Sequence, residues 1–147
     1  MSSTIRRKPE PLPEDKPVLL TFSAALRIFG DNLDHAELTR TLGLDPTHSH
    51  RKGEIPSPGS SPWPNDMWSY DAPVLRTLPL QEQISALEQV IRPQIPYLRS
   101  LRPKFHVDVF CSCQGKIYPA SLKVDHRALA LFTELETPFT VSFLLAR

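Results

Sequence analysis

The pattern of apolar and polar positions predicts a strand, a turn and a helix near the start of the chain. Between Val18 and Ile28, apolar residues occupy every second position and mostly polar or small residues lie between them, as in a sheet with one dry face. Gly30 indicates a turn. Asp34 is placed to cap a helix because its carboxylate can accept amide hydrogens of the first turn, and Gly43 can end that helix in a left-handed conformation. We expect the later elements to pack on this unit.

The longest helical pattern covers residues 79–102. Its apolar positions recur at spacings of three and four, which places them on one face of a helix. Pro93 and Pro96 interrupt the pattern, and each removes an amide donor and crowds the preceding turn. We therefore expect a kink, or two helices of which Pro93 opens the second.

The remaining pattern predicts four more strands and one more helix. A short strand is expected over residues 67–70 and an alternating strand over residues 105–113, followed by a hairpin partner over residues 117–124 that carries Pro119 and is therefore an edge strand. Asp125 can cap a helix over residues 126–135, and a last strand covers residues 139–145. This order favours an α+β fold, a two-layer sandwich of ferredoxin-like kind with a mostly antiparallel sheet and helices on one face.

Proline is concentrated in two segments that carry little apolar surface. The chain has 16 prolines in 147 residues. Residues 1–16 combine prolines with charges, so we expect a flexible arm there, followed by a single domain over residues 17–147. Residues 45–66 contain five prolines together with serine and glycine, which predicts a long loop of the kind that is usually functional or disordered.

Charge and cysteine content argue against several classes of protein. Basic and acidic residues number 17 and 16, so the net field favours neither nucleic acid nor an anionic membrane. No apolar run approaches the roughly 20 residues that span a bilayer, and none follows the basic residues near the N-terminus as in a secretory signal. Cys111 and Cys113 lie two apart on one predicted strand and splay from each other, so we expect buried, unpaired thiols in a reducing cytoplasm.

The strongest candidate for chemistry is the polar cluster that follows the first helix. Two histidines two positions apart could bind a transition metal, and the Arg-Lys pair after them could hold an anion. A structural zinc site needs four ligands and no second pair follows, so solvated loop histidines are the simpler interpretation. If a ligand binds, we expect it near the sheet edge at His48, His50, Arg51, Lys52 and Trp68.

Other polar residues have simpler structural explanations. His106 and Asp108 share the polar face of one predicted strand, where cross-strand pairing explains them without a function. No Gly-rich phosphate loop, serine nucleophile elbow or paired zinc signature occurs. We therefore name no catalytic residue, no metal ligand and no cofactor, and we favour a non-catalytic protein while leaving the enzyme question open.

Several short motifs occur in an order typical of one bacterial family. They are Ala-Leu-Arg-Ile-Phe-Gly-Asp-Asn-Leu-Asp from Ala25, Glu-Leu-Thr-Arg-Thr-Leu-Gly ending at Gly43, Leu44-Asp45-Pro46-Thr47, Arg51-Lys52-Gly53 and Trp68-Ser69. The chain resembles the family called domain of unknown function 4279 over about residues 24–147. The resemblance implies a small bacterial α+β domain, carries over no catalytic residue, and implies a binding role of the accessory or immunity-like kind.

These observations lead to three hypotheses of function. The first is a cytoplasmic domain that binds another protein through its sheet edge or its long loop, which ends in the aromatic residues Trp63, Trp68 and Tyr70. The alternative is a small-ligand or metal-binding protein, which could be an enzyme, centred on His48 to Lys52. The third is self-association as a homodimer through an exposed edge strand.

Overall fold

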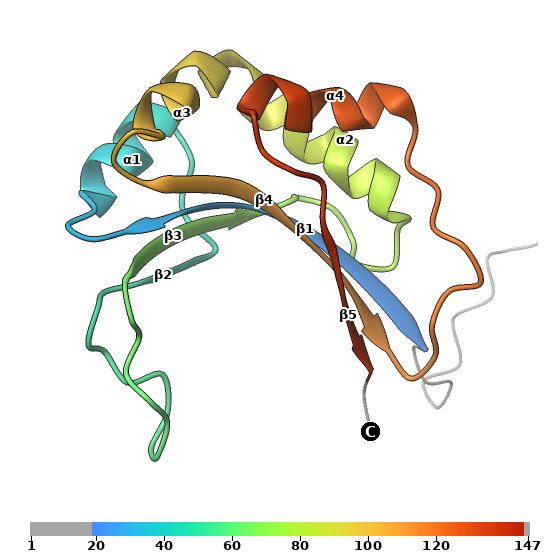
Figure 1. Cartoon of the computed structure of the whole chain (residues 1–147), viewed down its shortest axis with the longest axis horizontal. Coiled ribbons are helices and arrows are strands. Elements are labelled where there is room, and N and C mark those ends of the chain that lie inside the picture. Colours follow the sequence, from blue (N-terminus) through green and yellow to red (C-terminus); the bar gives the residue numbers. More distant parts are fainter. Residues whose placement is uncertain (1–18, 146–147) are drawn as a thin grey trace, which may run out of the picture.

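The computed structural model describes residues 19–145, so the expected arm at residues 1–16 lies outside the described residues. Five strands form one sheet in the order β2-β3-β1-β4-β5, and the helices cover one of its faces (Figure 1). The strands are β1 (Leu20–Gly30), β2 (His48–His50), β3 (Asp66–Asp71), β4 (His106–Gly115) and β5 (Val141–Leu145). The helices are α1 (His35–Leu42), α2 (Leu80–Ile91), the 3-10 turn η1 (Arg92–Gln94), α3 (Ile95–Leu101) and α4 (His126–Leu135).

Strand β1 is the centre of the sheet and carries the predicted alternation. It pairs antiparallel with β3 on one side and with β4 on the other. Strand β2 pairs antiparallel with β3, and only the β4–β5 pair is parallel. The helix-facing side chains of the sheet form one core with the apolar faces of the helices, which includes Leu26, Ile28, Trp68, Ile84, Leu87, Val107, Val109, Leu131 and Leu135. The α+β class with a mostly antiparallel sheet and one helical layer is therefore confirmed.

The local signals at helix ends act as predicted. The Asp34 carboxylate accepts a hydrogen bond from the Glu37 amide at 3.1 Å, and Asp125 accepts one from the Arg127 amide at 3.3 Å. Gly43 ends α1 in the left-handed region with φ 67°. Helix α4 ends at Leu135, and Glu136 after it caps the helix with φ 58°, so the helix stops before Pro138.

The long helical pattern is divided at its prolines. Pro93 lies in η1, which joins α2 to α3, so of the two expected outcomes the structure shows two helices. Pro96 rather than Pro93 stands in the first turn of the second helix. A proline in a first turn removes an amide that has no partner within the helix, which explains why α3 can start there.

Two expectations about the strands are wrong. Residues 117–124 form no strand, and β5 takes the outer edge of β4 instead, in parallel register with Cys113 opposite Phe143. Within the expected loop over residues 45–66, the three residues of β2 pair with β3. The observed strand order therefore differs from the expected ferredoxin-like arrangement.

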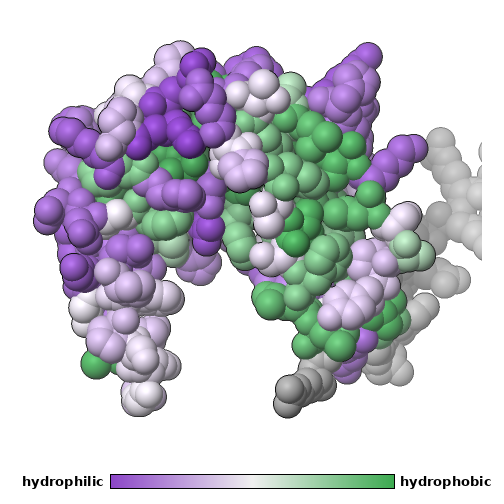
Figure 2. Space-filling model, viewed as in Figure 1, coloured by the Kyte–Doolittle hydropathy of each residue, from purple (hydrophilic) through white to green (hydrophobic). Residues whose placement is uncertain are grey.

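No described helix or strand covers the sheet face opposite the helices, although Trp63 of the loop over residues 51–65 stacks on His50 at its edge. We call it the open face; its side chains include Ser23, Arg27, Phe29, His50, Met67, His106, Asp108, Phe110 and Ser112. The sheet curves away from the helices, with the loop over residues 51–65 descending at one end and β5 at the other (Figure 1). In Figure 2 the end of the molecule with the 51–65 loop and the end with β5 stand on either side of a hollow under the sheet.

Candidate functional site

Arg27 lies in the middle of the open face and is held by Asp108 on the neighbouring strand. The antiparallel register of β1 and β4 places the two residues directly opposite each other. Arg27 donates from Nε to Oδ1 at 2.9 Å and from Nη2 to Oδ2 at 2.7 Å, and the two side chains are only 29% and 16% exposed. This bidentate, partly buried geometry makes the pair stronger than an ordinary surface ion pair.

Aromatic rings lie on both sides of this ion pair. The Arg27 Cζ atom is 5.2 Å from the ring centroid of Phe29 and 4.4 Å from that of Phe110, within the range of cation–π attraction. The His106 ring lies 4.4 Å from the Phe29 ring, and its Nε2 atom is 3.4 Å from Asp108 Oδ2. Cation, carboxylate and rings thus form one contiguous cluster on a sheet face over which none of the helices within residues 19–145 lies.

Two small hollows share Arg27 as a common wall. The first, of about 240 Å³, lies against the 51–65 loop and is lined by aromatic and apolar groups of Phe29, His50, Trp63 and Met67. The second, of about 250 Å³, lies on the β5 side and is lined by polar and aromatic groups that include His106, Asp108, Phe110, Thr140 and Ser142. Both are smaller than the roughly 300–1,000 Å³ of typical small-molecule sites, so their size suits single side chains of a larger partner.

His50 is built into the wall of the first hollow. Its imidazole stacks on Trp63 with ring centroids 4.0 Å apart and an interplanar angle of 3°. Burial, the largest cause, lowers the pKa of His50 below its ordinary value, although the carboxylate of Glu54 acts in the opposite direction. His50 Nε2 has no hydrogen-bond partner within residues 19–145. The ring that sequence analysis assigned to a polar loop is therefore mainly a stacking group.

The structure brings together only part of the ligand set that the sequence suggested. His48 shares the open face with His50, while Arg51 and Lys52 are exposed at the start of the loop. Their backbone amides bond to carboxylates, Arg51 to Glu54 and Lys52 to Asp66, which fixes the loop and leaves their side chains at the surface.

Trp68 does not belong with these residues, and its expected place near a ligand is a correction. It is 0% exposed in the core and donates from Nε1 to the Thr39 hydroxyl at 3.1 Å. Strand alternation explains this placement, because Trp68 lies one position from Met67 and therefore faces the helices. Among the described residues, no group of three or more His, Cys, Asp or Glu side chains is placed to hold a metal ion.

The centre of the cluster, Arg27, is not among the site residues expected from the sequence, although the sequence carries a signal for it. Arg27 lies on the polar face of the predicted first strand, but Phe29 and Phe110 occupy positions where that alternation calls for polar residues. Two aromatic residues on a sheet face that is expected to be exposed to solvent are a sign of a binding surface. From the sequence, Trp63 is expected only as part of an aromatic loop end.

The two cysteines are unpaired and buried beneath the helices, as expected. Burial, with a smaller contribution from the Asp108 carboxylate, raises the pKa of the Cys111 thiol to about 12. Burial also raises the pKa of Cys113. Both thiols are therefore protonated at neutral pH, and a protonated thiol is a poor nucleophile.

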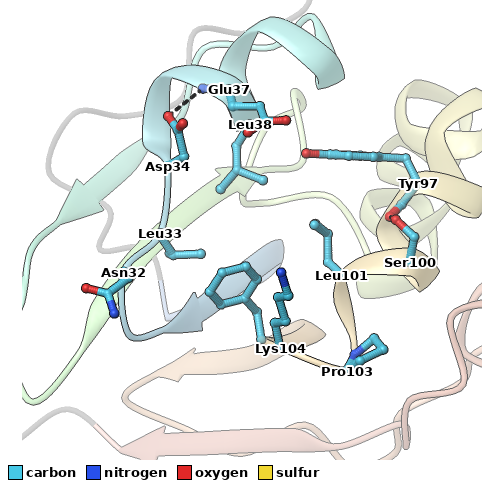
Figure 3. A pocket seen from close by; sticks show the side chains of 11 residues that line it. Asn32, Leu33, Asp34, Glu37, Leu38, Tyr97, Ser100, Leu101, Pro103 and Lys104 are labelled. Carbon is cyan, nitrogen blue, oxygen red and sulfur yellow. Dashed lines mark hydrogen bonds between the residues drawn. The ribbon is translucent and has the colours of Figure 1, made fainter.

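A third and larger hollow of about 500 Å³ lies between α1 and α3 (Figure 3). Its floor is apolar, with side chains of Leu33, Leu38 and Leu101. Glu37 of α1 and Lys104 in the turn after α3 both line it, so its wall carries both a cation and an anion. This cleft is within the size range of small-molecule sites.

The fold defines a class: a two-layer α+β domain whose single sheet is covered by helices on one face and carries an aromatic–arginine cluster on the other. The family model named Domain of unknown function (DUF4279) matches residues 20–145. The chain therefore belongs to the DUF4279 family. No curated protein and no solved structure matches it. None of the helices within residues 19–145 is long and apolar enough to cross a membrane.

Proposed function

We propose that this protein is a non-catalytic binding domain that holds a segment of another protein across its open face. The observation that carries the proposal is the Arg27–Asp108 pair enclosed by Phe29 and Phe110 on a face with no described cover. Arginine and aromatic residues are enriched at the hot spots of protein interfaces. An accessory or immunity-like role in a bacterial cytoplasm belongs to the same proposal, which the two unpaired cysteines support.

The shape of the open face favours an extended segment as the occupant. Alternate side chains of an extended chain point to the same side and lie about 7 Å apart. The two hollows adjoin across Arg27, so neighbouring same-side residues of one segment can enter both. The first hollow suits an aliphatic or aromatic side chain, whereas the second offers Asp108, Thr140 and Ser142 to a hydroxyl, amide or cationic group.

Site-specific photo-crosslinking in the native cells tests this assignment. A benzophenone amino acid replaces Thr140 or Pro64 at the rims of the two hollows, and Gln89 on the exposed side of α2 serves as the control position. We expect the same polypeptide to be captured from both rim positions and not from Gln89. Equal capture from Gln89, or no capture from either rim position, contradicts the proposal.

Truncation of the aromatic cluster measures its contribution once the captured polypeptide is purified. Phe110→Ala should weaken binding by roughly 30-fold, the effect of losing about 2 kcal/mol at a hot spot. Phe139→Ala is the matched control, because Phe139 is an aromatic residue that packs on Phe132 outside the two hollows. Unchanged affinity in a folded Phe110→Ala variant would place the interface elsewhere.

The cleft between α1 and α3 favours a second candidate function, the binding of a small zwitterion with an apolar body. Lys104 can pair with a carboxylate and Glu37 with an ammonium group, while the apolar floor takes the body of the ligand (Figure 3). This moves the small-ligand alternative away from the loop of His48 to Lys52. Free phenylalanine is a suitable probe and its uncharged N-acetyl amide the control.

Nuclear magnetic resonance titration distinguishes this second function from the first. We expect saturable shifts of the Leu38 and Leu101 amides with phenylalanine, no such shifts with the N-acetyl amide, and loss of binding in Lys104→Gln. Absence of saturable shifts at millimolar phenylalanine removes the candidate without affecting the open-face proposal.

A further inference from the structure

Among the described strands, β5 (Val141–Leu145) is an edge strand whose own residues lack the usual protecting features. It pairs with β4 on one side, and no described strand lies on the other. Natural edge strands are commonly protected by charged residues, proline, a bulge or very short length. The sequence Val-Ser-Phe-Leu-Leu of β5 has no charge and no proline. The opposite edge differs, since β2 has only the three polar residues His48–His50.

Large apolar side chains are exposed on and beside β5. Phe143, Leu144 and Leu145 are 45%, 54% and 52% exposed, and Ile117 and Tyr118 in the segment after β4 are 50% and 58% exposed. The Tyr118 and Phe143 rings contact edge to face at 6.0 Å. Apolar surface gathers at this end of the sheet in Figure 2. An exposed apolar patch of this kind marks an interaction site.

The size of this patch is suited to a dimer. Phe143 and Leu145 face the helix side of the sheet, whereas Leu144 faces the open face, so exposed apolar surface lies on both faces of this edge. The five side chains expose roughly 500 Å² in total, and an edge-to-edge joint covers part of it toward the ~800 Å² that one partner contributes to a standard interface. Backbone pairing along the five residues of β5 adds to that area. Apolar surface on both faces of the edge is therefore available to a strand that pairs along β5.

We propose that β5 pairs antiparallel with β5 of a second copy of this chain, which joins the two five-stranded sheets into one. Antiparallel pairing of a strand with itself is two-fold symmetric, as isologous dimers require. A strand without charges can approach its own copy without like-charge repulsion. Lys116 adjoins Gly115, which lies opposite Leu145 at one end of β5, so the two copies of Lys116 fall at opposite ends of the joint.

The mass of the full chain in solution tests the pairing. Sedimentation or light scattering over about 1 to 100 µM should report twice the 16.6 kDa chain mass. Leu144→Lys places a charge in the apolar patch and should raise the dimer dissociation constant by at least 30-fold. Ser49→Lys introduces the same charge on β2 at the other edge and should leave the dimer intact, with circular dichroism confirming that both variants fold.

Two results overturn the proposal. The first is a full chain that stays monomeric across this concentration range. Such a result overturns the proposal whether another protein or the segment before Leu19 pairs with β5 instead. A chain limited to residues 17–147 that dimerises while the full chain does not would identify the N-terminal segment as the occupant. The second is a Leu144→Lys variant that stays dimeric like the Ser49→Lys control.

Disulfide trapping locates the interface independently. Single cysteines replace Ser142, Phe143 and Leu144 in turn in a Cys113→Ala background, because Cys113 lies opposite Phe143 and would otherwise compete for a cysteine placed there. Residues opposite each other in an antiparallel pair have Cα atoms about 4.5–5.5 Å apart, within reach of a disulfide. Only the position nearest the two-fold axis should crosslink efficiently, and Ser49→Cys should not. Equal crosslinking at Ser49 contradicts pairing through β5.

Discussion

Asp66 is a buried carboxylate that ties the start of the 51–65 loop to the turn before α1. Its Oδ1 atom accepts the Lys52 amide at 2.7 Å, its Oδ2 atom accepts the Leu33 amide at 3.1 Å, and the residue is 6% exposed. The hydrogen bond from Lys52, the largest cause, lowers the pKa of Asp66 below its ordinary value, and burial opposes it. Asp66→Asn turns one acceptor into an amide NH₂ group that faces a backbone donor, so only one of the two hydrogen bonds survives.

The expected loss of stability follows from these two contacts. A hydrogen bond to a charged group contributes about 1.5–3 kcal/mol, and a bond to the neutral amide contributes less. We therefore expect the free energy of unfolding of Asp66→Asn to fall by about 2–3 kcal/mol, or roughly 5–10 °C in Tm for a chain of this size. Asp34→Asn is the matched control, because it makes the same chemical change at an exposed N-cap where asparagine caps equally well.

Urea unfolding from pH 7 to about pH 2.5 measures both variants. Because the pKa of Asp66 is depressed in the folded state, its contribution is complete above the unfolded value of about 3.9 and is lost as pH falls through the folded value. The difference between wild type and Asp66→Asn should therefore narrow below about pH 4. A loss under about 0.5 kcal/mol at pH 7, or a difference that stays constant to pH 2.5, refutes this reasoning.

Three further predictions concern the core and the helix ends. Gln83 is 2% exposed and donates from Nε2 to the carbonyls of Phe22 and Leu78 at 2.8 and 3.1 Å. Gln83→Met should lower the free energy of unfolding in urea by about 1–3 kcal/mol, whereas Gln89→Met on the exposed side of α2 should lower it by under ~0.5 kcal/mol. Gly43→Ala should lower stability by about 1 kcal/mol because φ 67° strains any residue with a Cβ atom, and an unchanged melting temperature would contradict this. Cys111, whose pKa is about 12, should react with a thiol reagent at pH 8 only after denaturant is added; rapid labelling of the native protein would show that the site opens.

The sequence predicted the elements whose signals are local. Asp34 and Gly43 act within one turn of the residues they cap, so their chemistry does not depend on the rest of the fold. Which segment pairs with the outer edge of β4 is not decided locally. Two apolar segments could pair there, and only one of them does. The segment over residues 117–124 contains Pro119, which cannot donate to the ladder, whereas β5 has an amide at every position. Strand β2 could not be predicted from its own residues, since pairing with β3 creates it.

The candidate site could be predicted only in fragments, because it depends on strand register. His106 and Asp108 were paired from alternation along one strand, and their contact is present. Arg27 joins them only because β1 and β4 align with Arg27 opposite Asp108. That alignment is set by two strands far apart in the chain and by the core beneath them, so periodicity within either strand could not supply it.

The central position of β1 in the sheet has a consequence while the ribosome is still synthesising the chain. Roughly 75 residues separate the end of β1 at Gly30 from the start of its partner β4 at His106. At about 5–20 residues per second, translation of that segment takes about 4–15 s, during which one edge of β1 has no partner strand. Chaperones that shield apolar nascent chains should therefore engage this protein early, and the strand that the finished sheet protects most completely is the one most vulnerable while the chain is being made.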